Sequence, residues 1–594
     1  MFSANDSRRN THTDRIAGHI KTDWNITKAL TLNYLGSFDV SNSKDEKSTL
    51  KANWNENPLP YGGNISDTLE SLLIADSQHP KAIDLQQEQN SREGNGLVYS
   101  HNLKLWYNIP NTKTFFQLGH NVSIGKNDTE EYDDTYYKYF NEESQNSRVI
   151  DRFLKKAKDS RNHEANARVM QYFKVKGFKR FCVYVEYMYN KNKHSADEMG
   201  YLAEQTEGNQ QNDYSVEDET TRNWWDESWQ HSVETSLSLG KGIYYAEFKP
   251  CFNFRHDEIS YTKRNLATLS PHKNYKYVSL QSLFRIRSEK FGTLRCQYFI
   301  TPNIPDIHSF VTYPDMADPQ YIILGNENLD MGLNHSLATW YSRNFTKENE
   351  NGKITRTLSA HAFFKHSSTS ISNSTTYDRT TGVITVKPVN ISGNWNGVAN
   401  IGFTTPLDVT QRFWLETFAE ATVLRTQTYS GVMTVDNTEQ QFNDNRLYSY
   451  SVTVKPRLKF APVDFSVAYE LRLEDNKGTY ASVNNKIQWQ HHIQGKFNWE
   501  IPWDLNFDAT VNYQNYTGYI SGKRENWVMM DMGIERAFLK NENLFVRISG
   551  HDLFNQNDSF LREYSATALT HTYQKTLGRY GMLTLRYRFS SKKK

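Results

Sequence analysis

Few residues in this sequence have the types and spacing that catalysis or metal binding requires. Cys182, Cys251 and Cys296 are odd in number and far apart, so they predict neither a metal-spaced pair nor a disulfide framework. The pairs His491-His492 and Glu142-Glu143 are adjacent, and adjacent residues on a strand point to opposite faces. The sequence has no phosphate-binding glycine loop, zinc-spaced set of histidines and cysteines, or nucleophile elbow. We therefore predict that the protein is not an enzyme and has no catalytic residues, metal site or cofactor.

Two polar and aromatic stretches are candidates for ligand binding. Residues 128–140, DTEEYDDTYYKYF, gather carboxylates and tyrosines, although such a run is more often a solvated loop. Residues 223–229, NWWDESW, contain Trp224, Trp225 and Trp229, whose rings could stack on a sugar or a peptide. A role in loop packing or at a membrane interface is at least as common for such tryptophans. We expect both stretches in long loops and take the three tryptophans as candidate ligand-binding residues.

The composition combines low hydropathy with many aromatic residues. The 594 residues have a mean hydropathy of −0.75 and contain no run of about 18 apolar residues, which excludes membrane-spanning helices. Aromatic residues nevertheless make up 14% of the chain. A transmembrane β-barrel reconciles these facts, because only every second residue contacts lipid and aromatic girdles lie at both interfaces. A tyrosine-rich soluble β-protein is the alternative. The net charge of +2 is too small to indicate a nucleic-acid partner.

Strand-like segments of period two recur along the chain. In residues 246–255, phenylalanines alternate with polar and charged residues, and residues 463–473 and 503–514 show the same pattern. Charged side chains facing a packed core would be costly to desolvate, whereas a water-filled lumen accepts them while their neighbours face lipid. The residues that we predict to face the lumen are Glu247, Lys249, Asn253, Arg255, Arg472 and Asp508.

The connections between these segments alternate in length. We count about 21 segments between residue 14 and Phe589, with the stretches that begin at 383 and 397 taken as one strand. Short turns such as 25–28, 110–112 and 240–242 are each followed by a longer link. The longer links include 43–95, 127–161, 194–227, 258–273, 302–330, 428–443 and 556–574. Antiparallel strands place the two kinds at opposite ends. The pattern predicts an all-β, antiparallel up-and-down transmembrane barrel with short periplasmic turns and long extracellular loops.

Several stretches of the second half resemble a known family. Within Thr301–Phe345, a proline-rich loop leads into the next strand through a motif that is similar to one in TonB-dependent outer-membrane receptors. Its matching residues are Asp318, Pro319, Gly325, Asn326, Asn328 and Leu329. Glu327 stands where the family usually has proline. Residues 375–393, 551–558 and 576–589 are also most similar to the large-barrel receptors of this family that are widespread in Bacteroidota-type bacteria.

The resemblance implies a 22-stranded barrel filled by an N-terminal plug, with a TonB box that contacts the inner-membrane energy-transducing complex. Counting back from Phe589 as the end of strand 22 makes residues 14–26 strand 2. We therefore expect residues 1–594 to be a single outer-membrane barrel domain without plug, signal sequence or strand 1. In this division, residues 1–13 are a loop remnant, 14–589 are strands 2 to 22, and 590–594 are a basic tail.

The predicted function is that of the barrel portion of a TonB-dependent outer-membrane receptor that imports a scarce ligand. Its expected partners are outer-membrane lipid, the TonB complex in an intact homologue, and a small-molecule, glycan or peptide ligand. One alternative is a passive porin-like or adhesion barrel in the outer membrane without energy coupling. Another is a soluble carbohydrate-binding β-protein that uses the tryptophan loops.

Overall fold

The computed structural model is built almost entirely from β-strands. It describes residues 2–54, 69, 71–73, 82–140, 147–206, 209–210, 214–318, 321–349, 352–378, 383–434, 437–479, 487–517, 525–539, 543–556, 559–564, 569–574 and 578–588. These residues form one sheet of 29 strands. Among them, no helix is both long and apolar enough to cross a membrane.

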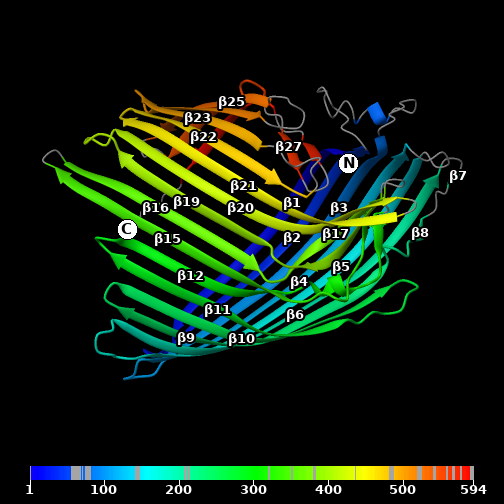
Figure 1. The fold of residues 1–594 in the computed structure, drawn as a ribbon, viewed down its shortest axis with the longest axis horizontal. Coiled ribbons are helices and arrows are strands. Elements are labelled where there is room, and N and C mark those ends of the chain that lie inside the picture. Colours follow the sequence, from blue (N-terminus) through cyan, green and yellow to red (C-terminus); the bar gives the residue numbers. More distant parts are fainter. Residues whose placement is uncertain are drawn as a thin grey trace.

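A wall of 21 strands forms the body of the molecule, and each strand is antiparallel to the next. Figure 1 shows these strands running obliquely around a curved surface. The prediction of an all-β antiparallel barrel with about 21 strands is therefore confirmed. The wall strands are β1 (Phe2–Asn25), β2 (Leu30–Trp54), β3 (Ala82–Asn108), β4 (Thr114–Tyr139), β5 (Ser147–Tyr172), β6 (Arg180–Thr206), β9 (Arg222–Lys241), β10 (Tyr244–Lys263), β11 (His272–Ser288), β12 (Gly292–Asn303), β15 (Gly332–Asn349), β16 (Gly352–Ser367), β19 (Trp395–Pro406), β20 (Phe413–Thr434), β21 (Asn437–Phe460), β22 (Val463–Lys477), β23 (Ile487–Ile501), β24 (Leu505–Thr517), β25 (Glu525–Phe538), β26 (Leu544–His551) and β29 (Tyr580–Tyr587).

Alternation of side chains gives the wall two chemically different faces. On β10, Phe248 and Phe252 are 50% and 57% exposed, and Val452 on β21 is 50% exposed. Glu247 and Lys249 lie on the opposite face of β10, because successive side chains of a strand alternate. Large apolar side chains exposed in such numbers are typical of a surface that contacts lipid. The apolar face is therefore the outer face, and the polar face lines the lumen.

Short and long connections alternate around the wall, as predicted. The connections 26–29, 109–113, 173–179 and 242–243 lie at one end, while the links that follow each of them lie at the other. Local hydrogen bonds shape the short turns. In the first turn, Thr27 Oγ1 accepts from the backbone N–H groups of Ala29 and Leu30 over 3.1 and 3.0 Å. In the turn before β10, Gly242 has a φ of 60°, a conformation that favours glycine.

The strands of the first half extend well beyond a membrane on the side of the long connections. β2 has 25 residues and β3 has 27, whereas a tilted strand crosses a bilayer with roughly 9–11 residues. We call the extensions of β1 to β11 the collar. The prediction that 43–95, 127–161, 194–227 and 428–443 are loops is wrong, because strands occupy most of their described residues, and strands also occupy half of 258–273. Polar residues on both faces of the collar remove the period-two contrast on which the prediction relied.

A second group of short elements, which we call the inner panel, lies on the same side as the collar. It contains the helical turn η1 (Ile307–Phe310) and the strands β13 (Asp315–Asp318), β14 (Tyr321–Ile323), β17 (Ser370–Asp378) and β18 (Ile384–Ile391). β18 pairs with β14 and β17, and β17 pairs with the end of β20. The prediction that the stretches at 383 and 397 form one strand is wrong. β18 ends at Ile391, and Gly393, with a φ of 90°, turns the chain before β19 begins.

The remaining short strands border the collar and the ends of the wall. β7 (Asn209–Gln210) and β8 (Ser215–Val216) pair with β6, and β27 (Ser559–Tyr564) pairs with β28 (Leu569–Gln574). β28 also pairs in parallel with β1 over Phe2–Ser7. Because 21 is odd, β1 and β29 run in the same direction, and among the described residues no pairing joins them. The predicted division into strands 2 to 22 stays a prediction.

The assignment of faces can be tested with one pair of neighbouring substitutions on β22. Val467→Arg would place a charge on the outer face about four residues from the short turn, where it should cost about 2–4 kcal/mol in folding into liposomes. Ala468→Arg would place the same charge in the lumen and should cost little. Folded fractions measured by gel mobility without heating would show the difference, and equal losses for both variants would contradict the assignment.

Candidate functional site

The charged residues that were predicted to face the lumen are neutralised by neighbours on the same face. Lys249 Nζ lies 3.1 Å from Glu247 Oε1, and Arg255 Nε lies 2.7 Å from Asp257 Oδ1. Arg472 Nη2 donates to Glu470 Oε1 over 3.1 Å. Each pair joins residues two apart on one strand, so both side chains point the same way.

Asn253 is the centre of a hydrogen-bond network across three strands. Its Oδ1 accepts from Gln230 Nε2 and Ser232 Oγ over 2.9 and 2.7 Å. Its Nδ2 donates to Ser279 Oγ over 3.1 Å and to the carbonyl of Cys251 over 3.0 Å. The side chain is buried and fully partnered, which suits a role in holding β9, β10 and β11 together.

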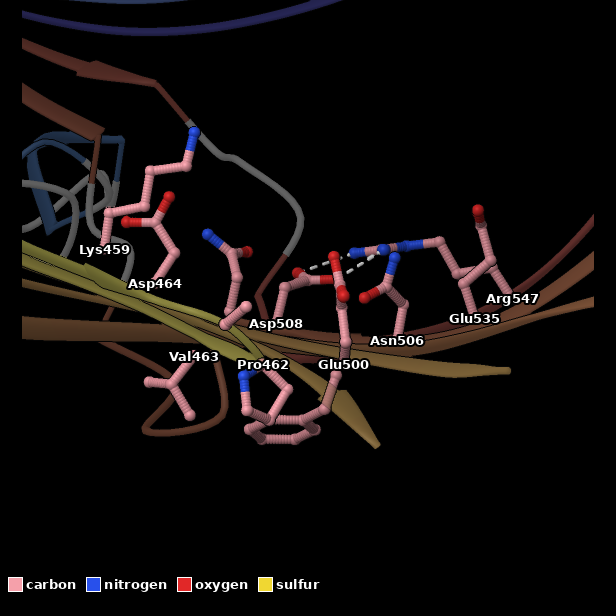
Figure 2. A pocket seen from close by; sticks show the side chains of 12 residues that line it. Lys459, Pro462, Val463, Asp464, Glu500, Asn506, Asp508, Glu535 and Arg547 are labelled. Atoms are coloured by element: carbon pink, nitrogen blue, oxygen red, sulfur yellow. Dashed lines mark hydrogen bonds and ion pairs between the residues drawn. The ribbon is translucent and has the colours of Figure 1, made fainter. Parts of the chain in front are cut away.

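Asp508 pairs with an arginine that lies two strands away. Arg547 on β26 donates from Nη2 to Asp508 Oδ2 on β24 over 2.8 Å, across the intervening strand β25 (Figure 2). Gly533 on β25 is the register partner of Asp508, and a Cβ there would fall 2.4 Å from Arg547 Nη2. The glycine therefore leaves room for the arginine. Figure 2 also shows Asp464 and Val463 on opposite sides of the sheet.

This ion pair borders a cavity of about 300 Å³ near the short turns. Other polar residues that line it are Lys459, Asp464, Asn498, Glu500, Asn506 and Glu535. Sequence reasoning found Asp508 but not its partner, because the pair spans 39 residues and two strands. The one sequence feature that could have indicated the pair is Gly533. Its position opposite Asp508 is known only from the register of β24 and β25.

The three candidate tryptophans do not form one binding platform. They lie on strand β9 rather than in a loop, and the period of two divides them. Trp224 faces the lumen side, 4.5 Å from the His308 ring in an edge-to-face contact. Trp225 and Trp229 face outward, where Trp229 stacks on His256 at 5.3 Å and Lys193 Nζ lies 5.0 Å from the Trp225 ring. The prediction of a shared tryptophan loop is therefore wrong, and a ligand role for each ring stays a prediction.

Side chains of the lumen face hold the inner panel in place. Asp226 on β9 lies 2.9 Å from His194 Nδ1 of β6 and 3.3 Å from His308 Nε2 of η1. Arg222 Nη1 lies 2.8 Å from Asp315 Oδ2 of β13. An apolar cluster fills the space between these contacts, with Ile259, Tyr261 and Val311 buried and Trp224, Leu269, Ile307 and Tyr313 packed against them. The panel thus rests on the inner surface of β6, β9 and β10.

The protonation states of Asp226 and His194 both affect the attachment of the inner panel to the wall. Burial favours the neutral form of Asp226, but hydrogen bonds from His194 and His308 outweigh it and hold the pKa of Asp226 below its ordinary value. The hydrogen bond to Asp226 outweighs burial and raises the pKa of His194. Both residues lie in the collar, beyond the residues that cross the membrane.

The family motif supplies the turn that shapes the inner panel. A Cβ on Gly325 would fall 1.9 Å from the carbonyl oxygen of Val311, so only glycine allows this close approach. Asn326 donates from its backbone N–H to Ser309 O over 2.7 Å and from Nδ2 to Pro388 O over 2.8 Å. The backbone N–H of Asn328 donates to Asn326 Oδ1 over 3.0 Å, and Leu329 is buried. Asp318 ends β13, and Pro319 lies outside the described residues.

A second cavity, of about 620 Å³, lies in the collar beside Asp133, whose pKa is raised. Its lining includes Asp133 and Asp134 of β4 and Asp151 of β5. Burial and the nearby charge of Glu88 raise the pKa of Asp133 to about 6. Among the described residues, no group of three or more His, Cys, Asp or Glu is arranged to hold a metal ion.

The wall, its two faces and its unequal ends together define a transmembrane β-barrel. The sequence matches a model of the outer membrane protein beta-barrel family over residues 288–587, just over half of its 594 residues. The chain therefore belongs to this family, and the predicted outer-membrane location is confirmed. The family match also confirms the prediction that the protein is not an enzyme.

Solved structures of receptors are similar to this chain over most of its length. One is the siderophore receptor PiuA from Acinetobacter baumannii, with a TM-score of 0.38, 11% identity, and coverage of 98% of this chain and 80% of that one. Another is a mutant hemophore receptor HasR from Serratia marcescens in complex with hemophore HasA and heme, with a TM-score of 0.39, 10% identity, and coverage of 97% and 80%. No curated protein sequence matches the chain. At these TM-scores the fold assignment rests on the strand pairing and the family match.

Loss of the Asp226 carboxylate, which contacts His194 and His308, should loosen the inner panel, and the effect should depend on pH. The raised pKa of His194 stabilises the attachment below about pH 6.5, and this is lost as pH rises through the folded value. The lowered pKa of Asp226 stabilises it above about pH 4, and this is lost as pH falls through the folded value. Protection of Ile307–Phe310 against hydrogen exchange should therefore be greatest between these limits. Asp226→Asn should lower protection there, whereas Asp197→Asn, on the other face of the wall, should not.

Removing the charge of Asp133 should stabilise the collar. Because folding raises the pKa of Asp133 to about 6, ionisation of this carboxyl group opposes folding. The stability of the folded collar therefore falls as pH rises from about 4 to 6. At pH 7.5, Asp133→Asn should gain about 1–3 kcal/mol against unfolding, and the gain should vanish below about pH 4. Limited proteolysis of the collar at both pH values measures the effect. A gain of equal size for Asp128→Asn, at an exposed position of the same strand, would contradict the assignment.

Proposed function

We propose that this chain is the barrel of an energy-coupled outer-membrane importer for a scarce ligand. The observation that carries the proposal is the number of wall strands. Barrels of 16–18 strands form open porin channels, whereas 22-stranded transporters carry a plugged lumen. A wall of 21 strands therefore encloses a lumen of transporter size.

The collar and the inner panel support the same conclusion. The collar raises paired strands above the membrane on the side where extracellular ligands arrive. The panel attaches to the lumen face of β9 through Asp226 and Arg222, so it lies across the route from the collar to the wall. A wide lumen with structural elements attached to its inner face near the collar suits capture of a scarce ligand more than free diffusion. Energy coupling through TonB follows from the family resemblance, and the ligand class is a small molecule, glycan or peptide.

Uptake in a Gram-negative host tests this function. The chain is joined to the plug and TonB box of a homologous receptor and produced in hosts with and without TonB, and uptake of three labelled probes is measured: ferrichrome, heme and maltoheptaose. We expect uptake of at least one probe that requires both the chain and TonB. Equal uptake in the two hosts would show a passive barrel. Failure to take up any of the probes in the host with TonB would also contradict the proposal.

A further inference from the structure

The lumen near the short turns has two sectors that differ in charge pairing. In the sector of β21 to β26, arginines have carboxylate partners, as in Arg547 with Asp508 and Arg457 with Asp464. In the sector of β6, β11 and β12, four arginines lie within a few residues of the short turns. They are Arg180, Arg285, Arg287 and Arg295, which we call the arginine shelf. Among the described residues, none of these four side chains has an ion-pair partner.

The register places the shelf on the lumen face. Arg285 lies opposite Tyr245 of β10, and Tyr245 is two residues before Glu247, on the same face. Arg295 lies opposite Arg285, so the two cations are direct cross-strand neighbours. Like charges in this position destabilise a sheet unless something neutralises them. The lumen carboxylate on the adjoining strand, Glu247, is already paired with Lys249.

Aromatic rings hold the arginines in defined positions. The guanidinium carbon of Arg285 lies 5.0 Å from the Tyr245 ring centroid, and that of Arg295 lies 5.2 Å from the Trp340 centroid. Arg180 lies 5.7 Å from the rings of both Tyr172 and Tyr245. Stacking uses the face of a guanidinium and leaves its N–H edges available for oxyanions. All four side chains are exposed, so a solute in the lumen can reach them.

We propose that the arginine shelf is a binding site for multivalent oxyanions, carrying carboxylate or phosphate groups, that pass through the lumen. Two arginine forks one strand spacing apart can each bind one oxyanion group in a bidentate way. Rings of arginine and lysine select anions in other membrane pores by the same chemistry. The site needs only the barrel and does not depend on TonB coupling, so it stands if the import proposal fails.

Binding of the trisulfonated dye pyranine to the full chain in zwitterionic nanodiscs tests the shelf. Fluorescence anisotropy gives the dissociation constant. The double variant Arg285→Gln/Arg295→Gln should weaken binding at least about tenfold, because each removes a charge-assisted hydrogen-bonding fork. The matched control is Arg457→Gln/Arg547→Gln, which removes the same charge from paired arginines and should change the constant by less than about twofold. Circular dichroism and gel mobility confirm that both variants fold.

Three further arms make the result decisive. Arg285→Lys/Arg295→Lys keeps the charge but removes the planar fork, so it should also weaken binding. Competition with citrate and with pyrophosphate distinguishes a carboxylate site from a phosphate site. Equal losses in the shelf and control variants would overturn the proposal, since they would show attraction to net charge alone. Absence of dye binding to the unsubstituted protein would overturn it as well.

Discussion

The structure depends on one constraint, which is that backbone N–H and C=O groups have no partners in hydrocarbon except one another. The wall satisfies this constraint because each strand between β1 and β29 pairs with a neighbour on both sides. Among the described residues β1 and β29 are the exception, because no pairing joins these two end strands of the wall. Over Phe2–Ser7, β28 covers part of the β1 edge. Outside the membrane water can satisfy the same groups, which allows the collar and its irregular borders.

Once the backbone is paired, the period of two divides the side chains between lipid and water. Apolar residues such as Phe252 take the outer face, and the charged residues take the lumen. Within the lumen, charge is balanced locally in most places but not everywhere. Same-strand pairs neutralise β10 and β22, and Gly533 lets Arg547 cross a strand to reach Asp508. The arginine shelf departs from this pattern, and its arginines rest on aromatic rings instead of carboxylates.

The family motif and the tryptophan stretch turn out to belong to one assembly. Gly325 and Asn326 close the turn that orders the panel, and Trp224 packs against the cluster beneath it. Asp226 then links the panel to two wall strands through His194 and His308. The family motif and Trp224, which was a candidate for stacking on a ligand, therefore act first as structural contacts on the lumen side of the collar.

The sequence by itself determined the fold class, the number of wall strands and the two ends of the barrel. These features follow from local alternation and from the lengths of connections, which need no knowledge of the partners of any strand. It did not reveal the collar, because paired strands outside lipid have polar residues on both faces. It also did not reveal the panel, the separation of Trp224 from Trp225 and Trp229, or the pairing of Asp508 with Arg547. Those features depend on register between strands far apart in the chain, which only the tertiary structure decides.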